Sequence, residues 1–391
     1  MRRGRRGLRL VAALAAAGLG AAACTGGSAT DGAQVVVPDG PCPSNLVIQT
    51  DWFPEMEHGG TYQLMGDDGH ADAATATYSG PLDPRYVGSH GVATVEIRAG
   101  GAAIERSVLD AMDADADITL GYVNTDDVIA ARREGRDVVG VMATLELSPQ
   151  MLMWNPARYS PLEFEDLART RAKFLYFPGS TYADYLVAQG YLTADQLDDG
   201  YDGSPTRWLE SDGDVIQQGF ATNEVFTYES ELDAWKRPVD FFLLHWLGYE
   251  NYPAMIVARS GDVAAQRDCL AALVPVMQRA WADFLVDPGP TSRKVVDILD
   301  TYDTFFKVSE ALNERAIEIF KQYEIASNGP DATLGNFDEA RVGRLLGIVG
   351  DVYAKRNDPL PAGLQPSDIV TNEFVDPAIG LPDGWNQLEA G

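Results

Sequence analysis

Short apolar runs alternate with amphipathic stretches through the first half of the chain, and this alternation restricts the fold more than any other feature. The runs at 46–50, 93–100, 117–123 and 138–143 have the length and residue types of buried strands. The stretches at 104–112 and 125–135 have the apolar spacing of helices. Strands and helices that alternate at these lengths predict an α/β fold, with a parallel sheet covered by helices on both faces.

A second α/β unit follows the first, and two apolar crossings connect them. One crossing is expected at 147–156, and the other at "YPAMIVA", residues 252–258. Two crossings between two α/β units are typical of two lobes joined by a hinge. We therefore expect a first lobe at 45–147, a second lobe at 148–258 and a helical return at 259–391, whose apolar stripes pack against the first lobe.

The N-terminus has the pattern of an export signal. A basic start, "MRRGRRGLRL", precedes an apolar segment that is too short to span a membrane, and Cys24 follows directly. This pattern predicts a signal peptide at 1–23 and lipidation of Cys24, which would anchor the protein to the outer face of the cell membrane. An ordinary signal peptidase site before a chance cysteine is the alternative. Residues 24–44 are then a flexible, lipidated tether.

The charge balance and the two remaining cysteines fit an exported protein. The chain has 58 acidic and 30 basic residues, and five of its arginines belong to the leader. Such an acidic chain disfavours nucleic acid and anionic lipid as partners. Cys42 and Cys269 are a candidate disulfide in an oxidising compartment, and two unpaired thiols are the alternative.

Polar and aromatic side chains gather where the predicted strands end. They are Trp52, Glu57, His58 and Tyr62 after the first strand, Tyr122, Asn124 and Thr125 after the third, Ser180, Thr181 and Tyr182 at a helix start, and Thr222, Asn223, Glu224 and Tyr228 after "QQGFA". In α/β folds, ligands bind beyond the C-terminal ends of the strands. Aromatic walls with a few hydrogen-bonding groups are what a small-molecule site requires, although each aromatic residue alone could equally be packing. Asp51 and Glu55 are interpreted as structural or solvated charges.

Other chemistry is not indicated by the sequence. There is no phosphate-binding loop of the Walker type, and the acidic run at 113–117 lacks the glycine and glutamate of a calcium loop. The four histidines, at 58, 70, 90 and 245, do not have paired metal-ligand spacing. We therefore expect neither a metal site nor a cofactor.

Several motifs resemble those of a known family. They are "WFPEMEH" at 52–58, "FPGSTY", "YDGSP", "QQGFATNEVFTYESELDAWKRPVDF" and "LGYENYPAMIVAR". From Leu46 onward the chain resembles solute-binding lipoproteins of ABC importers, in the branch related to the fungal thiamine-pyrimidine synthase. The resemblance implies a type II periplasmic-binding-protein-like fold, with a ligand cleft between two lobes joined by two hinge crossings. It also implies that Trp52, Glu57 and His58 face Tyr182 and Thr222–Glu224 across that cleft.

The resemblance predicts a binding protein and not an enzyme. The fungal enzyme needs a cysteine-rich run where this chain reads "GYENYPAMIV". We expect a monomer that delivers a small heteroaromatic solute, an aminopyrimidine thiamine precursor or a riboflavin-like compound, to an ABC permease and its ATPase. The alternatives are a pyrimidine-precursor biosynthetic enzyme, a binding protein for a sulfonate-type anion, and a surface lipoprotein that acts through protein contacts.

Overall fold

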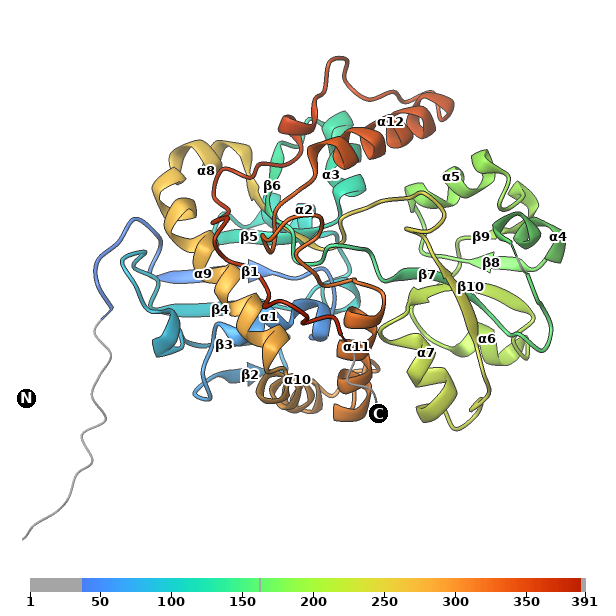
Figure 1. Ribbon diagram of the computed structural model, residues 1–391, viewed down its shortest axis with the longest axis horizontal. Coiled ribbons are helices and arrows are strands. Elements are labelled where there is room, and N and C mark those ends of the chain that lie inside the picture. Colours follow the sequence, from blue (N-terminus) through green and yellow to red (C-terminus); the bar gives the residue numbers. More distant parts are fainter. Residues whose placement is uncertain (1–36, 162, 388–391) are drawn as a thin grey trace, which may run out of the picture. The chain divides into compact units, whose positions relative to one another are not determined.

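The computed structural model describes residues 37–161 and 163–387. The expected signal peptide, Cys24 and the first part of the tether lie outside the described residues. The described chain contains two β-sheets, each with its own helices (Figure 1).

The first sheet has seven strands in the order β2-β3-β4-β1-β5-β12-β6. Their bounds are β1 Asn45–Gln49, β2 His70–Asp72, β3 Thr77–Pro81, β4 Thr94–Arg98, β5 Ile118–Val123, β6 Val138–Met142 and β12 Met255–Arg259. Its helices are α1 Gly59–Gln63, α2 Val108–Ala114 and α3 Thr125–Ala131. Every residue of β5 is buried, so both faces of the sheet are covered there.

This sheet is mixed, which differs from the expected parallel sheet. Strand β1 is parallel to β4 and β5, as expected. Strand β12, however, lies between β5 and β6 and is antiparallel to both. It enters the sheet from the second crossing, so the chain returns to the first lobe before Met255 and not at residue 258. The polar segment at 68–91 forms the β2–β3 hairpin, which pairs with β4 and extends the sheet at one edge.

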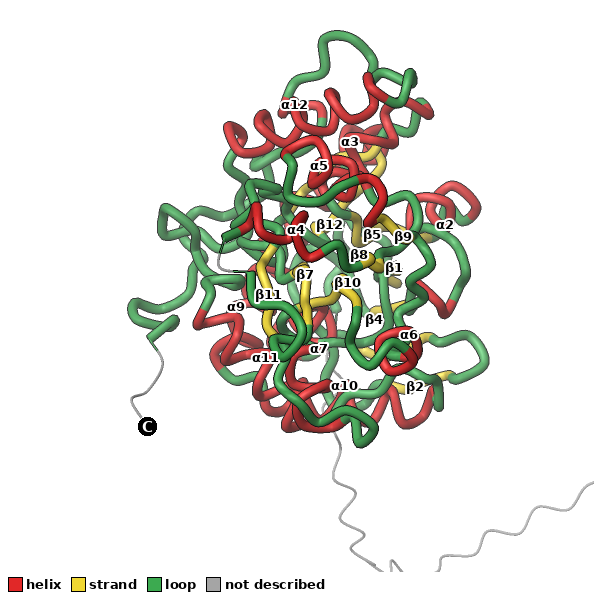
Figure 2. Tube along the Cα trace, turned by 90° about the vertical axis from the view of Figure 1, so that its right-hand side faces the viewer, coloured by secondary structure: helices red, strands yellow, loops and turns green. Residues whose placement is uncertain are grey.

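The second sheet has five strands in the order β11-β7-β10-β8-β9. Its strands are β7 Gln150–Trp154, β8 Lys173–Leu175, β9 Leu197–Asp198, β10 Val215–Phe220 and β11 Asp240–Leu243. Its helices are α4 Leu167–Thr170, α5 Thr181–Gln189, α6 Thr206–Glu210 and α7 Glu224–Phe226. In Figure 2 the molecule is turned by 90°, so that the lobe with this second sheet faces the viewer. Helix α5 ends at Gly190, which adopts the left-handed conformation that favours glycine at this position.

The remaining helices are α8 Ser260–Ala265, α9 Arg267–Val286, α10 Gly289–Tyr302, α11 Glu310–Gln322 and α12 Glu339–Lys355. Among the described residues, α9 is the one helix long and apolar enough to cross a membrane, but 61% of its most apolar window is buried inside the protein. It is therefore a core helix of this fold. Helix α12 contacts α5 of the second lobe as well as α3 of the first, so the expectation that the late helices pack only on the first lobe is incomplete (Figure 1).

The two crossings between the lobes meet at one arginine of α12. Arg341 is 4% exposed. Its guanidinium donates to the backbone oxygen of Glu146 at 2.7 Å in the first crossing. It also donates to the backbone oxygens of Glu250 at 2.8 Å and Asn251 at 2.9 Å in the second. A single buried side chain thus links both connections to the C-terminal region.

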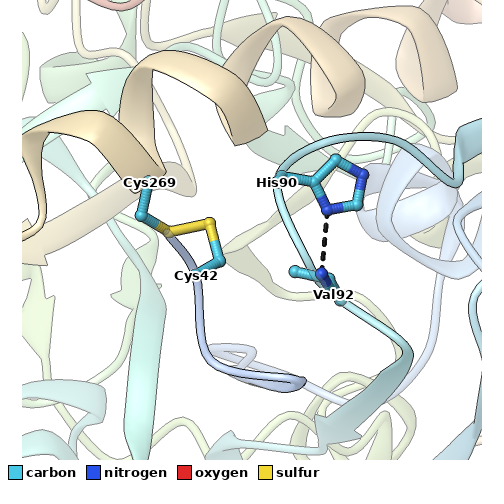
Figure 3. The surroundings of a disulfide bond; sticks show 4 residues. All are labelled: Cys42, His90, Val92 and Cys269. Carbon is cyan, nitrogen blue, oxygen red and sulfur yellow. Dashed lines mark hydrogen bonds between the residues drawn. A yellow bond between two sulfur atoms is a disulfide. The ribbon is translucent and has the colours of Figure 1, made fainter. Parts of the chain in front are cut away.

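A disulfide joins Cys42 to Cys269, as the sequence suggested (Figure 3). Cys42 lies just before β1, and its N–H donates to the backbone oxygen of His90 at 2.9 Å. His90 accepts from the N–H of Val92 at 3.0 Å, which orders the neighbouring loop. Cys269 is fully buried in the first turns of α9. The bond therefore fixes the start of the folded body to the longest helix of the protein.

We expect loss of this disulfide to destabilise the protein substantially. It closes a loop with a sequence separation of 227 residues. A disulfide that closes so long a loop lowers the entropy of the unfolded chain and adds about 3 to 5 kcal/mol to the free energy of unfolding. The double variant Cys42→Ala, Cys269→Ala should therefore unfold at a lower denaturant midpoint than the oxidised wild type. Reduced wild-type protein should shift to the same midpoint, and equal midpoints before and after reduction would contradict the prediction.

Candidate functional site at the junction of the two lobes

The loop after β1 carries the first group of candidate residues. Gln49 stabilises the turn by donating to the backbone oxygens of Arg98 at 3.0 Å and Ala99 at 3.1 Å. The hydroxyl of Thr50 donates to the backbone oxygen of Trp52 at 2.7 Å. The loop is therefore held at the C-terminal end of its strand, where α/β folds bind ligands.

Two glycines allow this loop and α1 to approach α9 closely. A Cβ atom on Gly59 would lie 2.2 Å from the ring of Phe284, and one on Gly60 would lie 2.2 Å from the ring of Trp281. Side chains at either position would push the two helices apart. Because the two glycines follow His58 directly in the sequence "HGG", their close packing on α9 also fixes the position of His58.

His58 is fully buried and is oriented by Asp51. Its Nε2 lies 2.7 Å from Oδ1 of Asp51. Its ring meets the edge of Tyr122 at a centroid distance of 4.9 Å, and the hydroxyl of Tyr122 is hydrogen-bonded to Thr61. The Nδ1 atom has no hydrogen-bond partner within the part of the chain that the structure describes. Asp51 is thus a structural partner of His58, and one ring nitrogen stays available.

Glu57 connects the first lobe to the second. Its carboxylate accepts a hydrogen bond from the hydroxyl of Thr222, which follows β10 in the second lobe. Glu57 is 3% exposed and Thr222 is 2% exposed, so this contact is almost closed to solvent. Two of the predicted residues, far apart in the sequence, are therefore in direct contact at the junction.

Trp52 lies among aromatic rings from three parts of the chain. Its ring centroid is 5.9 Å from that of Phe177, at the end of β8, and 6.0 Å from that of Phe306, just before α11. A Cβ atom on Gly203 would lie 3.2 Å from the Trp52 ring. Phe177 in turn packs against Tyr201 at 4.9 Å. These rings form an apolar wall around Trp52, which is on the same loop as Glu57.

Four carboxylates meet at the same junction. They belong to Asp51, Glu55, Glu57 and Glu224, and we call them the acidic cluster. Burial raises the pKa of the Glu55 carboxyl well above its usual range, and the nearby charge of Glu57 raises it further. Burial raises the pKa of Glu224 to about 7, although the N–H of Phe220 donates to this carboxylate at 2.7 Å. Within the described ranges, no lysine or arginine forms an ion pair with any member of the cluster.

The start of α3 adds a further carboxylate from the first lobe. Asp127 has an exposed side chain, yet desolvation by the surrounding protein raises its pKa to about 7, with a contribution from the charge of Asp126. Its carboxylate accepts a hydrogen bond from Nδ2 of Asn124 at 3.1 Å. The charge of Asp51 also contributes to the raised pKa of Asp127. Asp127 therefore adds to the negative charge on the first-lobe side of the acidic cluster.

The crossing at 244–254 supports this end of α3. Buried Asp126 accepts from the hydroxyl of Tyr249 at 2.7 Å and from Nδ2 of Asn251 at 2.8 Å. Asn124 accepts from the N–H of Ala254 at 2.9 Å. The hydroxyl of Thr125 donates to the backbone oxygen of Tyr252. The residues after β5 are thus fixed by the hinge.

The sequence-predicted residues divide into two groups. Those in contact with the junction are Trp52, Glu57, His58, Tyr122, Asn124, Thr222 and Glu224. The others are held mainly within their own lobes. Tyr62 is fully buried in the first core, and the hydroxyl of Tyr228 accepts from Gln217 at 2.9 Å. Asn223 accepts from Thr227 at 3.3 Å.

The helix start at 180–182 contacts α12 and the second crossing. The hydroxyl of Ser180 donates to the backbone oxygen of Phe177 at 2.8 Å. Thr181 lies 3.5 Å from the hydroxyl of Tyr353, and the hydroxyl of Tyr182 donates to Gln218. A direct role of these residues in ligand binding stays a prediction.

Sequence reasoning missed several residues of the junction. Glu55 is buried in the acidic cluster and is not a solvated charge. Phe177, Tyr201 and Phe306 form the wall around Trp52. The sequence signal for Glu55 was its place between Asp51 and Glu57, because charges this close in one short loop are difficult to hydrate separately.

Comparison with known proteins supports the fold. No protein-family model and no curated protein sequence matches this chain. Among solved structures, the alkanesulfonate-binding protein SsuA from Xanthomonas axonopodis pv. citri, bound to MOPS, is 12% identical with a TM-score of 0.55, covering 84% of this chain and 98% of that one. The periplasmic aliphatic sulphonate binding protein SsuA from Escherichia coli is 13% identical with a TM-score of 0.52, covering 90% and 97%.

A protein from Bordetella bronchiseptica RB50 gives a similar result, with 14% identity and a TM-score of 0.54 over 85% of this chain and 96% of that one. Identities this low show the fold and not the ligand. The two sheets, the two crossings and these similarities together confirm the expected fold class. The chain has the two-lobe α/β fold of the periplasmic binding proteins.

Proposed function

We propose that this protein is the extracytoplasmic solute-binding component of an ABC importer, and that it binds a small heteroaromatic solute between its lobes. The observation that carries the proposal is the Glu57–Thr222 hydrogen bond, which joins the lobes and involves the same loop as Trp52 with its aromatic wall. Aromatic faces together with a few fixed polar groups are the usual composition of a small-molecule site.

The proposed mechanism is closure of the lobes about the hinge. In an open form, Thr222 moves away from Glu57, and both side chains become available to a solute. A ligand that contacts both lobes stabilises the closed form by its differential affinity for that form. The permease then recognises the closed, loaded protein.

The side chains at the junction suit an aminopyrimidine or a flavin-like ring. Trp52 offers an aromatic face for stacking. Glu57 and Glu224 accept hydrogen bonds from amino or ring N–H groups, and charge-assisted bonds of this kind are strong. The free Nδ1 of His58 provides a further polar contact. An aminopyrimidine thiamine precursor and a riboflavin-like compound both satisfy this arrangement.

A sulfonate ligand is the main alternative within the same fold. Two of the similar structures are named as sulfonate-binding proteins, and one of them is bound to MOPS. The acidic cluster argues against this ligand here, because it has no lysine or arginine ion-pair partner among the described residues to balance an anion. An anionic head group beside several carboxylates is repelled.

A biosynthetic enzyme is the alternative from another class. It requires turnover of the ligand or chemical change at His58. Intact-mass measurement of the purified protein, before and after incubation with the ligand, separates a binding protein from an enzyme that consumes its own histidine. We propose a binding role, since Asp51 and Tyr122 hold this imidazole in a fully buried position.

We further propose that lipid on Cys24 anchors a monomer to the outer face of the membrane, close to the permease and its ATPase. The acidic surface disfavours nucleic acid as a partner. Mass analysis of the mature N-terminus distinguishes a lipidated Cys24 from an ordinary cleavage product.

We expect Trp52→Ala and His58→Ala to weaken ligand binding. The ligand is first identified by native mass spectrometry of the protein as purified, and its affinity is then measured by calorimetry. Loss of a stacking face costs about 1 to 3 kcal/mol, so Trp52→Ala should weaken binding at least about fivefold. Trp246→Ala is a matched control, because Trp246 is 40% exposed and lies outside the junction. Unchanged affinity in the Trp52 variant, with its fold intact by circular dichroism, would remove Trp52 from the site.

We also expect Thr222→Val to shift the protein toward the open form. The variant keeps the shape of the side chain but leaves the Glu57 carboxylate without its donor across the junction, which costs about 1 to 3 kcal/mol. Small-angle scattering should show a larger radius of gyration without ligand, and affinity should fall about tenfold. Thr119→Val is the control, since this buried threonine in β5 makes a long 3.4 Å bond within its own lobe. Equal scattering profiles and affinities for both variants would contradict the proposed closure.

A further inference from the structure

Glu55 is the residue of the acidic cluster whose charge is least compensated. Only 9% of its surface is exposed. Its carboxylate makes no hydrogen bond or ion pair with any residue that the structure describes, whereas Glu57 accepts from Thr222 and Glu224 accepts from Phe220. The charges that act on Glu55 come from Glu57, Asp51 and Glu224, so its carboxylate faces the cluster.

Without a ligand, burial and the neighbouring charges raise the pKa of Glu55 and favour its protonated form over the unpaired carboxylate. Buried charges in proteins are normally paired or bound to a cation. Among the described residues, the basic side chain in contact with the cluster is that of His58, and Asp51 already occupies one of its nitrogens. The positive charge that would balance Glu55 is therefore absent from the described residues around it.

Basic residues on the adjacent helices are engaged elsewhere. Lys294 of α10 donates to the backbone oxygens of Tyr62 and Met65, and the carboxylates acting on it are Asp67 and Asp83. On α11, Arg315 pairs with Glu318 at 2.6 Å. Neither the Lys294 nor the Arg315 side chain has a hydrogen bond or ion pair with a carboxylate of the acidic cluster.

We propose that the ligand carries a positive charge, as a protonated amine or a quaternary nitrogen, and that Glu55 is its main counter-ion. This inference rests on the proposed solute-binding function and adds the charge of the solute to it. The aromatic wall fits the same chemistry, because the face of a tryptophan such as Trp52 attracts a cation.

An organic cation fits better than a metal ion. Within the described residues, no three histidine, cysteine, aspartate or glutamate side chains are placed so that they could hold a metal. The cluster carboxylates therefore do not converge on one point. They come from both lobes, with Asp51, Glu55 and Glu57 from the first lobe and Glu224 from the second. Negative charges that are spread over several positions in this way suit an organic cation better than a single metal ion.

Binding of a cation should be linked to proton release. The titratable groups that face Glu55 or lie near it are Asp51, Glu57, His58, Tyr122, Asp127 and Glu224. Without ligand, burial raises the pKa of Glu55 well above its usual range and that of Glu224 to about 7, so both carboxyls hold protons below neutral pH. A cation favours the ionised carboxylates and displaces those protons. Affinity should therefore rise as the pH increases from about 5 to about 8.

The test is calorimetry on the full mature chain with two sets of probes that differ only in charge. One set is an aminopyrimidine with an aminomethyl, a hydroxymethyl or a sulfonatomethyl group, and the other is benzylamine, benzyl alcohol and phenylmethanesulfonate. Each probe is titrated at low and high pH, in two buffers of different ionisation enthalpy to count the protons released. The variants are Glu55→Gln and, as a control with the same change of charge, Glu314→Gln on the exposed face of α11.

We expect the amine to bind best in each set, at least tenfold better at the higher pH, with release of protons. Glu55→Gln should weaken the amine at least tenfold, leave its neutral isostere unchanged and release fewer protons, while Glu314→Gln behaves as the wild type. Equal binding of amine and alcohol, unaffected by Glu55→Gln, would overturn the charge inference and leave the proposed function standing. Preference for the sulfonates would overturn the charge inference and the heteroaromatic solute in favour of the anion alternative. Failure of every probe to bind would overturn the proposed function itself.

Discussion

The position of helix α9 is the constraint on which the rest of this structure depends. Its rings at Trp281 and Phe284 pack directly on the backbone of Gly59 and Gly60, so the loop after β1 has one place to lie. The same helix carries Cys269, which is bonded to the segment before β1. Strand β1 is thus fixed at both ends by one helix from the far part of the sequence, and the acidic cluster is built on the end that the glycines fix.

The junction combines features that stability alone would not select. Buried carboxylates without basic partners reduce the free energy of unfolding, and so does a buried imidazole nitrogen without a partner. Natural chains keep such costs where a ligand or a reaction needs them. The surrounding structure is correspondingly rigid, with Asp51 on His58, Gln49 on the turn, and Asn251 and Tyr249 on the start of α3. Groups held this firmly are positioned before the ligand arrives, which lowers the entropy cost of binding.

Local sequence patterns predicted the elements well and the long-range arrangement less well. The apolar runs located β1, β4, β5 and β6, since buried strands need such runs wherever they lie in a sheet. The antiparallel insertion of β12 was not predicted, because strand order depends on how the second crossing returns and not on the strand's own residues.

The same limit applies to the candidate site. Glu57 and Thr222 were both selected from strand ends, but their mutual hydrogen bond depends on how two lobes meet. Glu55 has the same side chain as Glu57, and only tertiary packing makes one hydrogen-bonded and the other unpaired. The aromatic wall was missed for a similar reason, because Phe177 and Phe306 come from segments with no sequence relation to Trp52.

The hinge explains how a site of this kind can open without losing its structure. Arg341 bonds to backbone oxygens of both crossings and is itself part of α12, which also touches α5 through the Arg356–Asp184 pair at 2.6 Å. Rotation of the second lobe would leave the three Arg341 bonds intact, since all of them lie at the pivot. The exposed Arg356–Asp184 pair and the Glu57–Thr222 bond lie away from that pivot and would separate. Exposed ion pairs contribute about 0 to 1 kcal/mol, so this outer contact opposes opening only weakly. In the proposed mechanism, the buried junction therefore decides the balance between open and closed forms, and a bound solute would act there.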